Sequence, residues 1–382
     1  MDNDIRALLI LILAGGGLAS RRTLAAARPT LAGAIDAGPP AWRQAGCSPG
    51  QQRRLALPDV GLLERAAAWL EQPGHHLLTP ADAAFPETLR CSPEPPLALF
   101  VDGNPDTLRH PAIAVVGSRS PTPTGRALAA EFSAAFCAAG LGVTSGLAAG
   151  VDAAAHRAAL SADGITLAVI GCGPDVVFPP HHAALQHEIA SRHAVVSEYP
   201  PGSAPQPAYF PARNRLVAGL TAATVVIEAA NRSGALITAR LAAEAGREVC
   251  AVPGSVRNPR AAGCHRLIRD GAALVESAAD VMALVAPALA HALPDLQTHQ
   301  VSPTEQGRRA MLPPSLASDP DYQRLWKMLD HDPIPMDSLI VSSGLTAARL
   351  SSMLLTMELA GIVVSEHGRY CRNPGFPTST AS

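Results

Sequence analysis

The chain has 382 residues, of which 48% are hydrophobic and 16% are charged, and its formal net charge is −2. This composition is typical of a globular protein with two or three domains and excludes a largely disordered chain. A nucleic-acid site would have to be a local basic patch, because the whole chain does not attract phosphate. Lys327 is the only lysine, so no glycine-rich turn carries the lysine of an ordinary P-loop.

The seven cysteines are dispersed, without a C-x-x-C pair or histidine and cysteine pairs at zinc spacing. We therefore expect no metal site and a reducing, cytoplasmic location. The apolar run Ala7–Ala14 could be the core of a signal peptide, but Asp2 and Asp4 give its flank the wrong charge. It is also too short to span a bilayer, so a buried helix and no membrane contact are expected.

In chain order, residues 1–105 are expected to form a small helical domain with an extended connector, since glycine and proline interrupt its helical patterns. Residues 106–286 alternate β-branched runs with alanine-rich helical runs, which is typical of βαβ units. The fold class is therefore α/β, with an extended Rossmann-like parallel sheet domain. Its expected strands are Ala112–Val116, Gly142–Ser145, Ile165–Ile170, His193–Ser197, Thr224–Ile227 and Glu248–Val252.

Residues 287–318 are rich in proline, alanine and serine, which predicts a linker. Residues 319–374 follow the pattern of a winged-helix domain, three helices and then a β-hairpin, and 375–382 form a tail. The expected elements are the helices Tyr322–Leu329, Met336–Val341 and Thr346–Leu359, with Thr346 as N-cap, and the hairpin Ile362–Arg372, turning at His367 and Gly368.

The candidate recognition helix of this domain, Thr346–Leu359, offers Arg349 as its only cation and also carries Glu358. Helices that read duplex DNA normally bring several basic or amide groups to the groove. Contact with a protein, or weak DNA contact through the wing residues His367, Arg369 and Arg372, fits this helix at least as well.

Three segments could bind an anion. The first is the turn Gly117, Ser118 and Arg119 after the first strand, where backbone amides, a hydroxyl, a guanidinium and a helix amino end would gather. The alternative is a tight turn with a solvent-facing arginine. The turn lacks the G-x-G-x-x-G spacing, and no ribose-binding acid follows it, so a dinucleotide is not expected.

The second segment follows the second strand. Gly146 and Gly150 would let the backbone fold over the carboxyl edge of the sheet, where open α/β folds bind ligands. Asp152 is expected to cap the next helix, and His156, four residues on, is expected to pack against the sheet. A metal site or an acid–base pair at these two residues is the less favoured alternative.

The third candidate consists of two stretches, each of which begins an expected helix. Phe210 could stack a base while Arg213 and Arg215 hold phosphates, and Asn214 between them is counted among the DNA-binding residues. The alternative is a buried Phe210 with arginines on the surface. Ser233, Gly234 and Thr238 follow the fifth strand and therefore open onto the edge that carries Arg119. Convergence of separate anion-binding turns on one edge favours a binding site there.

No catalytic set is evident. Glu228 ends the fifth strand without a nucleophile beside it, and Cys264 and His265 are helix neighbours whose side chains diverge. There is no G-x-S-x-G elbow and no H-E-x-x-H motif. The sequence therefore favours binding without catalysis.

These motifs, in this order, resemble the DNA-processing protein A family (DprA, also called Smf). The resemblance implies a cytoplasmic, homodimeric binder of single-stranded DNA that needs no cofactor, protects incoming DNA and loads the RecA recombinase during natural transformation. It implies phosphate contacts by Gly117, Ser118, Arg119, Arg213, Arg215, Ser233 and Thr238. The family usually has arginine or lysine where Ala149 stands. The similarity is carried by Val115–Gly125, Ser145–His156, Ser197–Gly202, Phe210–Leu220, Glu228–Gly254 and Gly263–Ala272.

Two other functions are possible. Nucleoside-monophosphate phosphoribohydrolases share this type of fold, but they carry a P-G-G-x-G-T-x-x-E stretch, and Asn231–Thr238 lacks its glycine pair and acid. A transcription factor would use the winged helix to read DNA and the Rossmann-like unit to sense a ligand. The low cation count of the recognition helix argues against that function.

Overall fold

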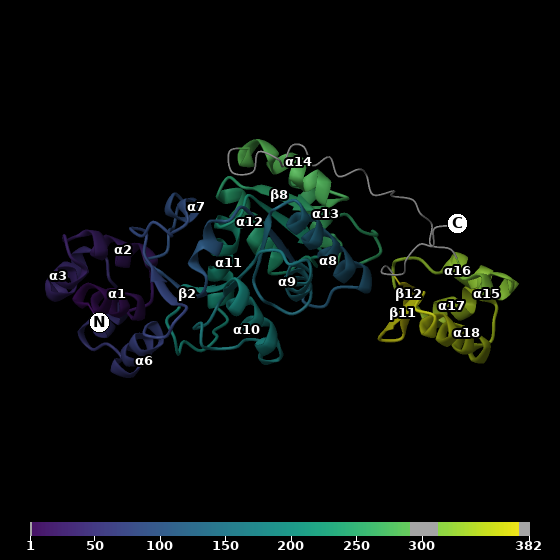
Figure 1. Cartoon of the computed structure of the whole chain (residues 1–382), viewed down its shortest axis with the longest axis horizontal. Coiled ribbons are helices and arrows are strands. Elements are labelled where there is room, and N and C mark those ends of the chain that lie inside the picture. Colours follow the sequence, from purple (N-terminus) through teal and green to yellow (C-terminus); the bar gives the residue numbers. More distant parts are fainter. Residues whose placement is uncertain (1, 291–311, 374–382) are drawn as a thin grey trace.

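The computed structural model describes residues 2–290 and 312–373 (Figure 1). The amino-terminal helices lie at one end, the large sheet with its helices lies in the middle, and the winged helix lies at the other end. In the described ranges no single helix is long and apolar enough to cross a membrane. The helices Met336–Ser343 and Ala347–Leu359, bent by 113° at their junction, reach that length and apolar composition only when taken together.

Six helices form the amino-terminal unit. The apolar run near the start forms a helix whose Leu8, Leu9 and Ile12 are buried against Trp69, so the expectation of a buried helix is confirmed. The helices are α1 (Asn3–Leu13), α2 (Leu18–Ala26), α3 (Leu31–Asp36), α4 (Gly38–Gln44), α5 (Pro49–Ala56) and α6 (Val60–Leu70).

The central sheet has nine strands in the order β1-β2-β6-β5-β4-β3-β7-β8-β9, and all strands from β6 to β9 in this order are parallel. The six strands expected from the sequence are present to within one residue at each end. The sheet consists of β1 (His75–Leu78), β2 (Leu99–Gly103), β3 (Ala112–Gly117), β4 (Gly142–Ser145), β5 (Thr166–Ile170), β6 (Ala194–Ser197), β7 (Ala223–Ile227), β8 (Glu248–Ala251) and β9 (Ala273–Leu274).

Strands β1, β2 and β9 were not expected as strands. β2 pairs antiparallel with both β1 and β6, so it adds an antiparallel edge to a parallel sheet. Both β1 and β2 lie within residues 1–105, and the extended connector expected there is thus hydrogen-bonded into the large sheet. The β9 strand has only two residues, too few to show a periodic pattern.

Helices cover both faces of the sheet because its strands are apolar on both sides. Ile113 and Val115 pack against α8, α9 and α14, whereas Ala114 and Val116 pack against α11, α12 and α13. These helices are α7 (Glu87–Arg90), α8 (Pro123–Ala138), α9 (Val151–Ser161), α10 (Ala183–Arg192), α11 (Tyr209–Gly219), α12 (Ala235–Glu244), α13 (Ala262–Arg269) and α14 (Ala278–Leu289).

The order of the strands creates a switch point beside β3. From β3 the chain proceeds outward through β4, β5 and β6 on one side, and then returns to β7, β8 and β9 on the other. Gly117 at the end of β3 is in register with Ile227 at the end of β7. Ligands of open α/β sheets bind outside the carboxyl ends of strands at such a point.

The winged helix has the expected three helices and hairpin, and Thr346 accepts the N-cap hydrogen bond from the amide of Arg349. α14 extends past residue 286 and α15 lies within 287–318, so parts of the expected linker are helical; residues 291–311 and the tail at 375–382 lie outside the described residues. The elements are α15 (Pro314–Ala317), α16 (Pro320–Met328), β10 (Ile334–Pro335), α17 (Met336–Ser343), α18 (Ala347–Leu359), β11 (Val363–Glu366) and β12 (Arg369–Arg372).

Candidate nucleic-acid interface

A cavity of about 710 Å³ lies at the carboxyl edge of the sheet, at the switch point beside β3. Ten of the twelve residues that the sequence singles out line it, drawn from the turns after β3, β4 and β7 and from the starts of α11 and α12. They are Gly117, Ser118, Arg119, Gly146, Phe210, Arg213, Asn214, Ser233, Gly234 and Thr238. Gly150 and Arg215 are not among the residues that line it.

The turn after β3 is shaped by two glycines. A Cβ on Gly117 would lie 1.9 Å from the carbonyl oxygen of Ile227, so only glycine fits where β3 and β7 end side by side. Gly150 has a φ of +86°, and a Cβ there would lie 2.3 Å from the carbonyl oxygen of Ser118. The amide of Val151 donates to that same oxygen at 3.1 Å. Gly150 therefore supports the Ser118–Arg119 turn from behind and does not itself line the cavity.

Arg213 does not have the exposed position that a phosphate contact requires. It is 4% exposed, and its guanidinium donates to the carbonyl oxygens of Gly146, at 2.6 Å, and of Val169. It also donates from Nε to Oδ1 of Asn214 at 3.2 Å. Burial lowers the pKa of Arg213, and the nearby Asp152 opposes this shift. The expected contact between Arg213 and phosphate is thus replaced by a structural role that ties the β4 and β5 ends to α11.

Arg215 is also engaged elsewhere. Its guanidinium forms an ion pair with Glu198 and donates to the carbonyl oxygen of Glu94 at 3.0 Å. Both side chains of the ion pair are more than four-fifths buried. Because Arg215 is held in this buried pair and does not line the cavity, its expected contact with a phosphate in the cavity does not fit the structure.

Asp152 is not the N-cap that the sequence suggests. Gly150 occupies the N-cap position of α9, and Asp152 lies within the first turn. Its carboxylate accepts from the amides of Gly146, at 3.1 Å, and Ala148, at 3.3 Å. Burial raises the pKa of Asp152, against the opposing effect of Arg213 and of these amides. Asp152 and Arg213 together hold the loop that follows β4.

Two exposed cations face solvent around the cavity. Arg119 and Arg232 both line it, and within the described part of the chain neither has a carboxylate at ion-pair distance. Arg232 is not among the residues singled out from the sequence. Its place directly before Ser233, after the end of β7, could have revealed it, because every residue of that turn opens onto the same edge.

The cavity also has an aromatic wall. The Phe210 ring lies 5.3 Å from the ring of Phe178, which is 40% exposed and lines the same cavity. Phe210 is half-buried, between the two placements that the sequence allowed. An aromatic face beside exposed arginines can stack a base while the arginines hold the adjoining phosphates.

The polar groups at the start of α12 are partly used to fix the helix. Nδ2 of Asn214 donates to the carbonyl oxygen of Gly234 at 3.4 Å, and the hydroxyl of Ser233 accepts from the amide of Ala235 at 3.3 Å. Thr238 is buried one turn further on. The helix start is therefore preorganised, and its amide groups make an anion-binding end.

Glu228 serves the same architecture. Its carboxylate accepts hydrogen bonds from the amide of Thr122, at 2.7 Å, and from its hydroxyl, at 2.5 Å. This interaction fastens the start of α8 to the end of β7. Over residues 2–290 and 312–373, no three histidine, cysteine or acidic side chains are grouped to hold a metal ion.

Comparison with known proteins identifies the family. The model of the DNA recombination-mediator protein A family matches residues 76–286, and that of the DprA winged-helix domain matches residues 309–369. The chain belongs to the DNA recombination-mediator protein A (DprA/Smf) family. This membership confirms the resemblance drawn from the sequence motifs.

Individual relatives agree with this assignment. The chain is 38% identical to Protein Smf of Escherichia coli over 324 residues, which cover 84% of this chain and 83% of the relative. It is 46% identical to the DNA processing protein DprA of Streptococcus pneumoniae over 202 residues, covering 53% and 71%. The X-ray structure of DprA from Streptococcus pneumoniae aligns with a TM-score of 0.65 at 35% identity, covering 74% of this chain and 98% of that one.

Proposed function

We propose that the cavity at the carboxyl edge binds single-stranded DNA. Arg119 and Arg232 hold phosphates, the amides of the turns add neutral donors, and Phe210 and Phe178 offer faces for unpaired bases. The observation that carries the proposal is the charge around this cavity. Its lining holds one carboxylate, Asp152, and that group is buried beneath the backbone while both arginines are exposed.

Single strands suit this site better than duplex does. Bases that are already paired cannot turn their faces to an aromatic wall, whereas unpaired bases can. The contacts are to phosphates and base faces, so binding is largely independent of sequence and weakens with salt. The winged helix is a poorer candidate, since the guanidinium of Arg349 on α18 lies 3.3 Å from the carboxylate of Asp319.

Membership of the family supports a biological role for this binding. Relatives of this chain are named DNA processing proteins, which supports a role in DNA processing. Within that role, the protein protects incoming single strands and loads RecA onto them during natural transformation. It acts as a cytoplasmic homodimer and binds DNA without turning it over.

Fluorescence anisotropy with oligo-dT and a matched duplex tests the site. Arg119→Ala should weaken oligo-dT binding about 10- to 100-fold, as expected for a charge-assisted contact of roughly 1.5–3 kcal/mol. It should also lower the salt slope by about 0.7 for each phosphate that the variant no longer neutralises. The matched control is Arg109→Ala, which removes an exposed arginine just before β3, at the opposite edge of the sheet.

Unchanged oligo-dT binding by Arg119→Ala, or equal affinity of the wild type for duplex, would show that this cavity is not the DNA site. An AMP hydrolysis assay would then test the phosphoribohydrolase alternative. The fastening of Glu228 to Thr122 leaves that alternative without an available acid at the end of β7.

A further inference from the structure

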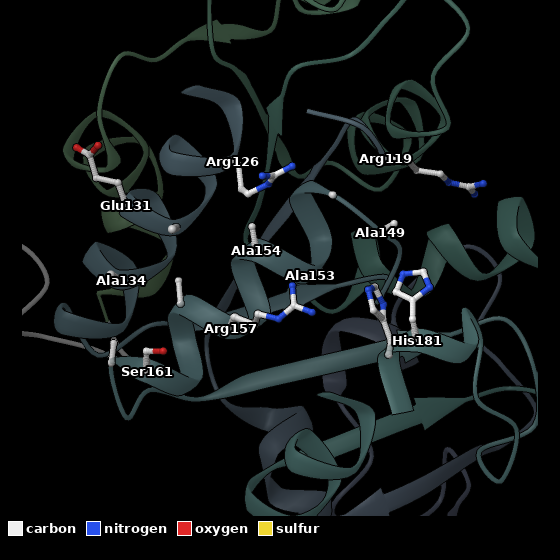
Figure 2. Close-up of a pocket in the computed structure, with 15 residues that line it drawn as sticks. Arg119, Arg126, Glu131, Ala134, Ala149, Ala153, Ala154, Arg157, Ser161 and His181 are labelled. Atoms are coloured by element: carbon white, nitrogen blue, oxygen red, sulfur yellow. The ribbon is translucent and has the colours of Figure 1, made fainter. Parts of the chain in front are cut away.

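A second hollow, of about 1060 Å³, lies between α8 and α9 next to the proposed DNA cavity. Arg119 lines both, so the two hollows adjoin at the turn after β3. Figure 2 shows Arg126 and Arg157 projecting from the two helices toward the side where Arg119 and His181 lie. We call this hollow the α8–α9 groove.

The lining of the α8–α9 groove near Arg119 is mainly positively charged. Arg119, Arg126 and Arg157 are exposed there. Arg126 lies 3.9 Å from Glu366 of the winged helix in a partly exposed pair, whereas Arg157 has no carboxylate at ion-pair distance in the described ranges. The only acid in the lining is Glu131, which lies at the opposite end of the view from Arg119. Clefts lined by one sign of charge concentrate the opposite ion, here a polyanion.

Alanines make up much of the lining of the groove between its arginines. Residues 130 and 134 lie on one face of α8, and residues 153, 154 and 158 lie on one face of α9. Arg126 and Arg157 rise from among these alanines. From Gly150 to Ser161 the groove runs roughly 16 Å along α9, at about 1.5 Å per residue. That length accommodates a short stretch of nucleic-acid backbone.

We propose, resting on the function above, that the α8–α9 groove is a second stretch of the single-stranded DNA path. The strand leaves the cavity past Arg119, and Arg126 and Arg157 hold its next phosphates. Ala149 also lines this groove. Arg157, two helical turns further on, supplies a positive charge to the same groove.

Strand length separates this proposal from the proposed function. The probes are oligo-dT of about 6 and about 20 nucleotides, chosen because folds that bind single strands cover roughly 4–16 nucleotides. Anisotropy titrations of the full chain over a salt series compare wild type, Arg126→Ala with Arg157→Ala, Arg119→Ala and the control Arg109→Ala. Arg126→Gln with Arg157→Gln serves as a second groove variant, should the alanine pair reduce the melting temperature.

On the longer strand, the groove variant should bind roughly tenfold more weakly or worse. Its salt slope should fall by about 1.4, or about 0.7 for each of the two phosphates that the arginines neutralise. Binding of the short strand should change much less. Ala149→Arg added to Arg157→Ala should recover long-strand affinity, since it returns a cation to the same groove. Arg109→Ala should match wild type on both strands.

The groove proposal is overturned by either of two results, provided that Arg119→Ala still weakens binding of both strands. The groove variant binds the long strand as tightly as wild type does, or it loses the same factor of affinity on the short and the long strand. In either result the function proposed for the first cavity stands. If Arg119→Ala also leaves both strands unaffected, the proposed function fails as well. Loss on duplex but not on the long single strand would instead assign the groove to double-stranded DNA and overturn the proposal.

Discussion

Replacing Arg213 tests whether this arginine is a structural element or a DNA contact. Arg213→Ala removes the donor to the carbonyl oxygens of Gly146 and Val169 and the cation nearest the buried Asp152. Removing one partner from a buried charged network costs about 3–5 kcal/mol. At roughly 2–4 °C per kcal/mol for a domain of this size, the melting temperature should fall by roughly 6–20 °C.

Arg119→Ala is the matched variant, because it also deletes one guanidinium from the same cavity but from an exposed position. Its effect on stability should stay within about 0.5 kcal/mol. Thermal melts followed by circular dichroism, together with oligo-dT binding measured well below the melting range, separate the two. If Arg213→Ala kept the wild-type melting temperature yet lost DNA binding, Arg213 would be a direct contact and the structural interpretation would be refuted.

Three further outcomes are expected. Gly117→Ala should lower stability by about 3 kcal/mol, since its Cβ would overlap Ile227, whereas Gly234→Ala, with open space around its Cβ, should be near neutral in a denaturant titration. Glu366→Gln should tighten long oligo-dT binding about two- to fivefold, because Glu366 lies 3.9 Å from Arg126 in an exposed pair, and Glu244→Gln on α12 should not; weaker binding would contradict this. Burial lowers the pKa of His156 from 6.5 to about 3; the unfolded state therefore takes up the proton first, and about 2 kcal/mol of stability should be lost as pH falls from 7.5 to 5. His156→Gln should lose less over that range, and an equal loss would exclude His156 as the source.

The basis of the His156 prediction is its hydrogen bonding, which agrees with the packed role expected from the sequence. Nδ1 lies 2.7 Å from the hydroxyl of Thr166, and that hydroxyl donates to the carbonyl oxygen of Val143 at 2.9 Å. Nδ1 must therefore carry the proton, which leaves Nε2 without one. Nε2 is buried with no partner among the described residues. A second proton would thus create an unpaired buried charge.

The sheet could be predicted from the sequence where its strands are continuous apolar runs. Largely apolar runs are typical of strands that helices cover on both faces, and most residues of the six expected strands are apolar. β1 and β2 escape prediction for different reasons, since β1 is the edge strand whereas β2 lies between β1 and β6. Half-buried His75 and His76 start β1, and the pairing of β2 with β6 joins residues about a hundred positions apart. No local pattern encodes that pairing.

The sequence allowed the location of the candidate site at the sheet edge to be predicted, but not which of its side chains are free to contact a ligand. Turns that follow parallel strands must meet at one edge, so the convergence of three segments was available from topology. The burial of Arg213 was not expected, because Arg213 and Arg215 together have the pattern of an exposed basic cluster. A usable signal existed: Arg213 shares its helix face with Leu216, Val217 and Leu220, at spacings of three, four and seven.

Because the formal net charge of the chain is close to zero, its basic surface must arise from a local arrangement of charges. Several exposed arginines elsewhere are matched by a nearby acid, as Arg240 is by Glu244 and Arg266 is by Asp270. Around the switch point the acids are absent from the cavity lining or buried, while Arg119 and Arg232 stay exposed. The local excess of positive charge at the cavity thus arises because exposed carboxylates are missing from its lining, and not because arginines are unusually numerous there. Such a patch attracts phosphate over about a Debye length of 8–10 Å although the whole chain is slightly negative.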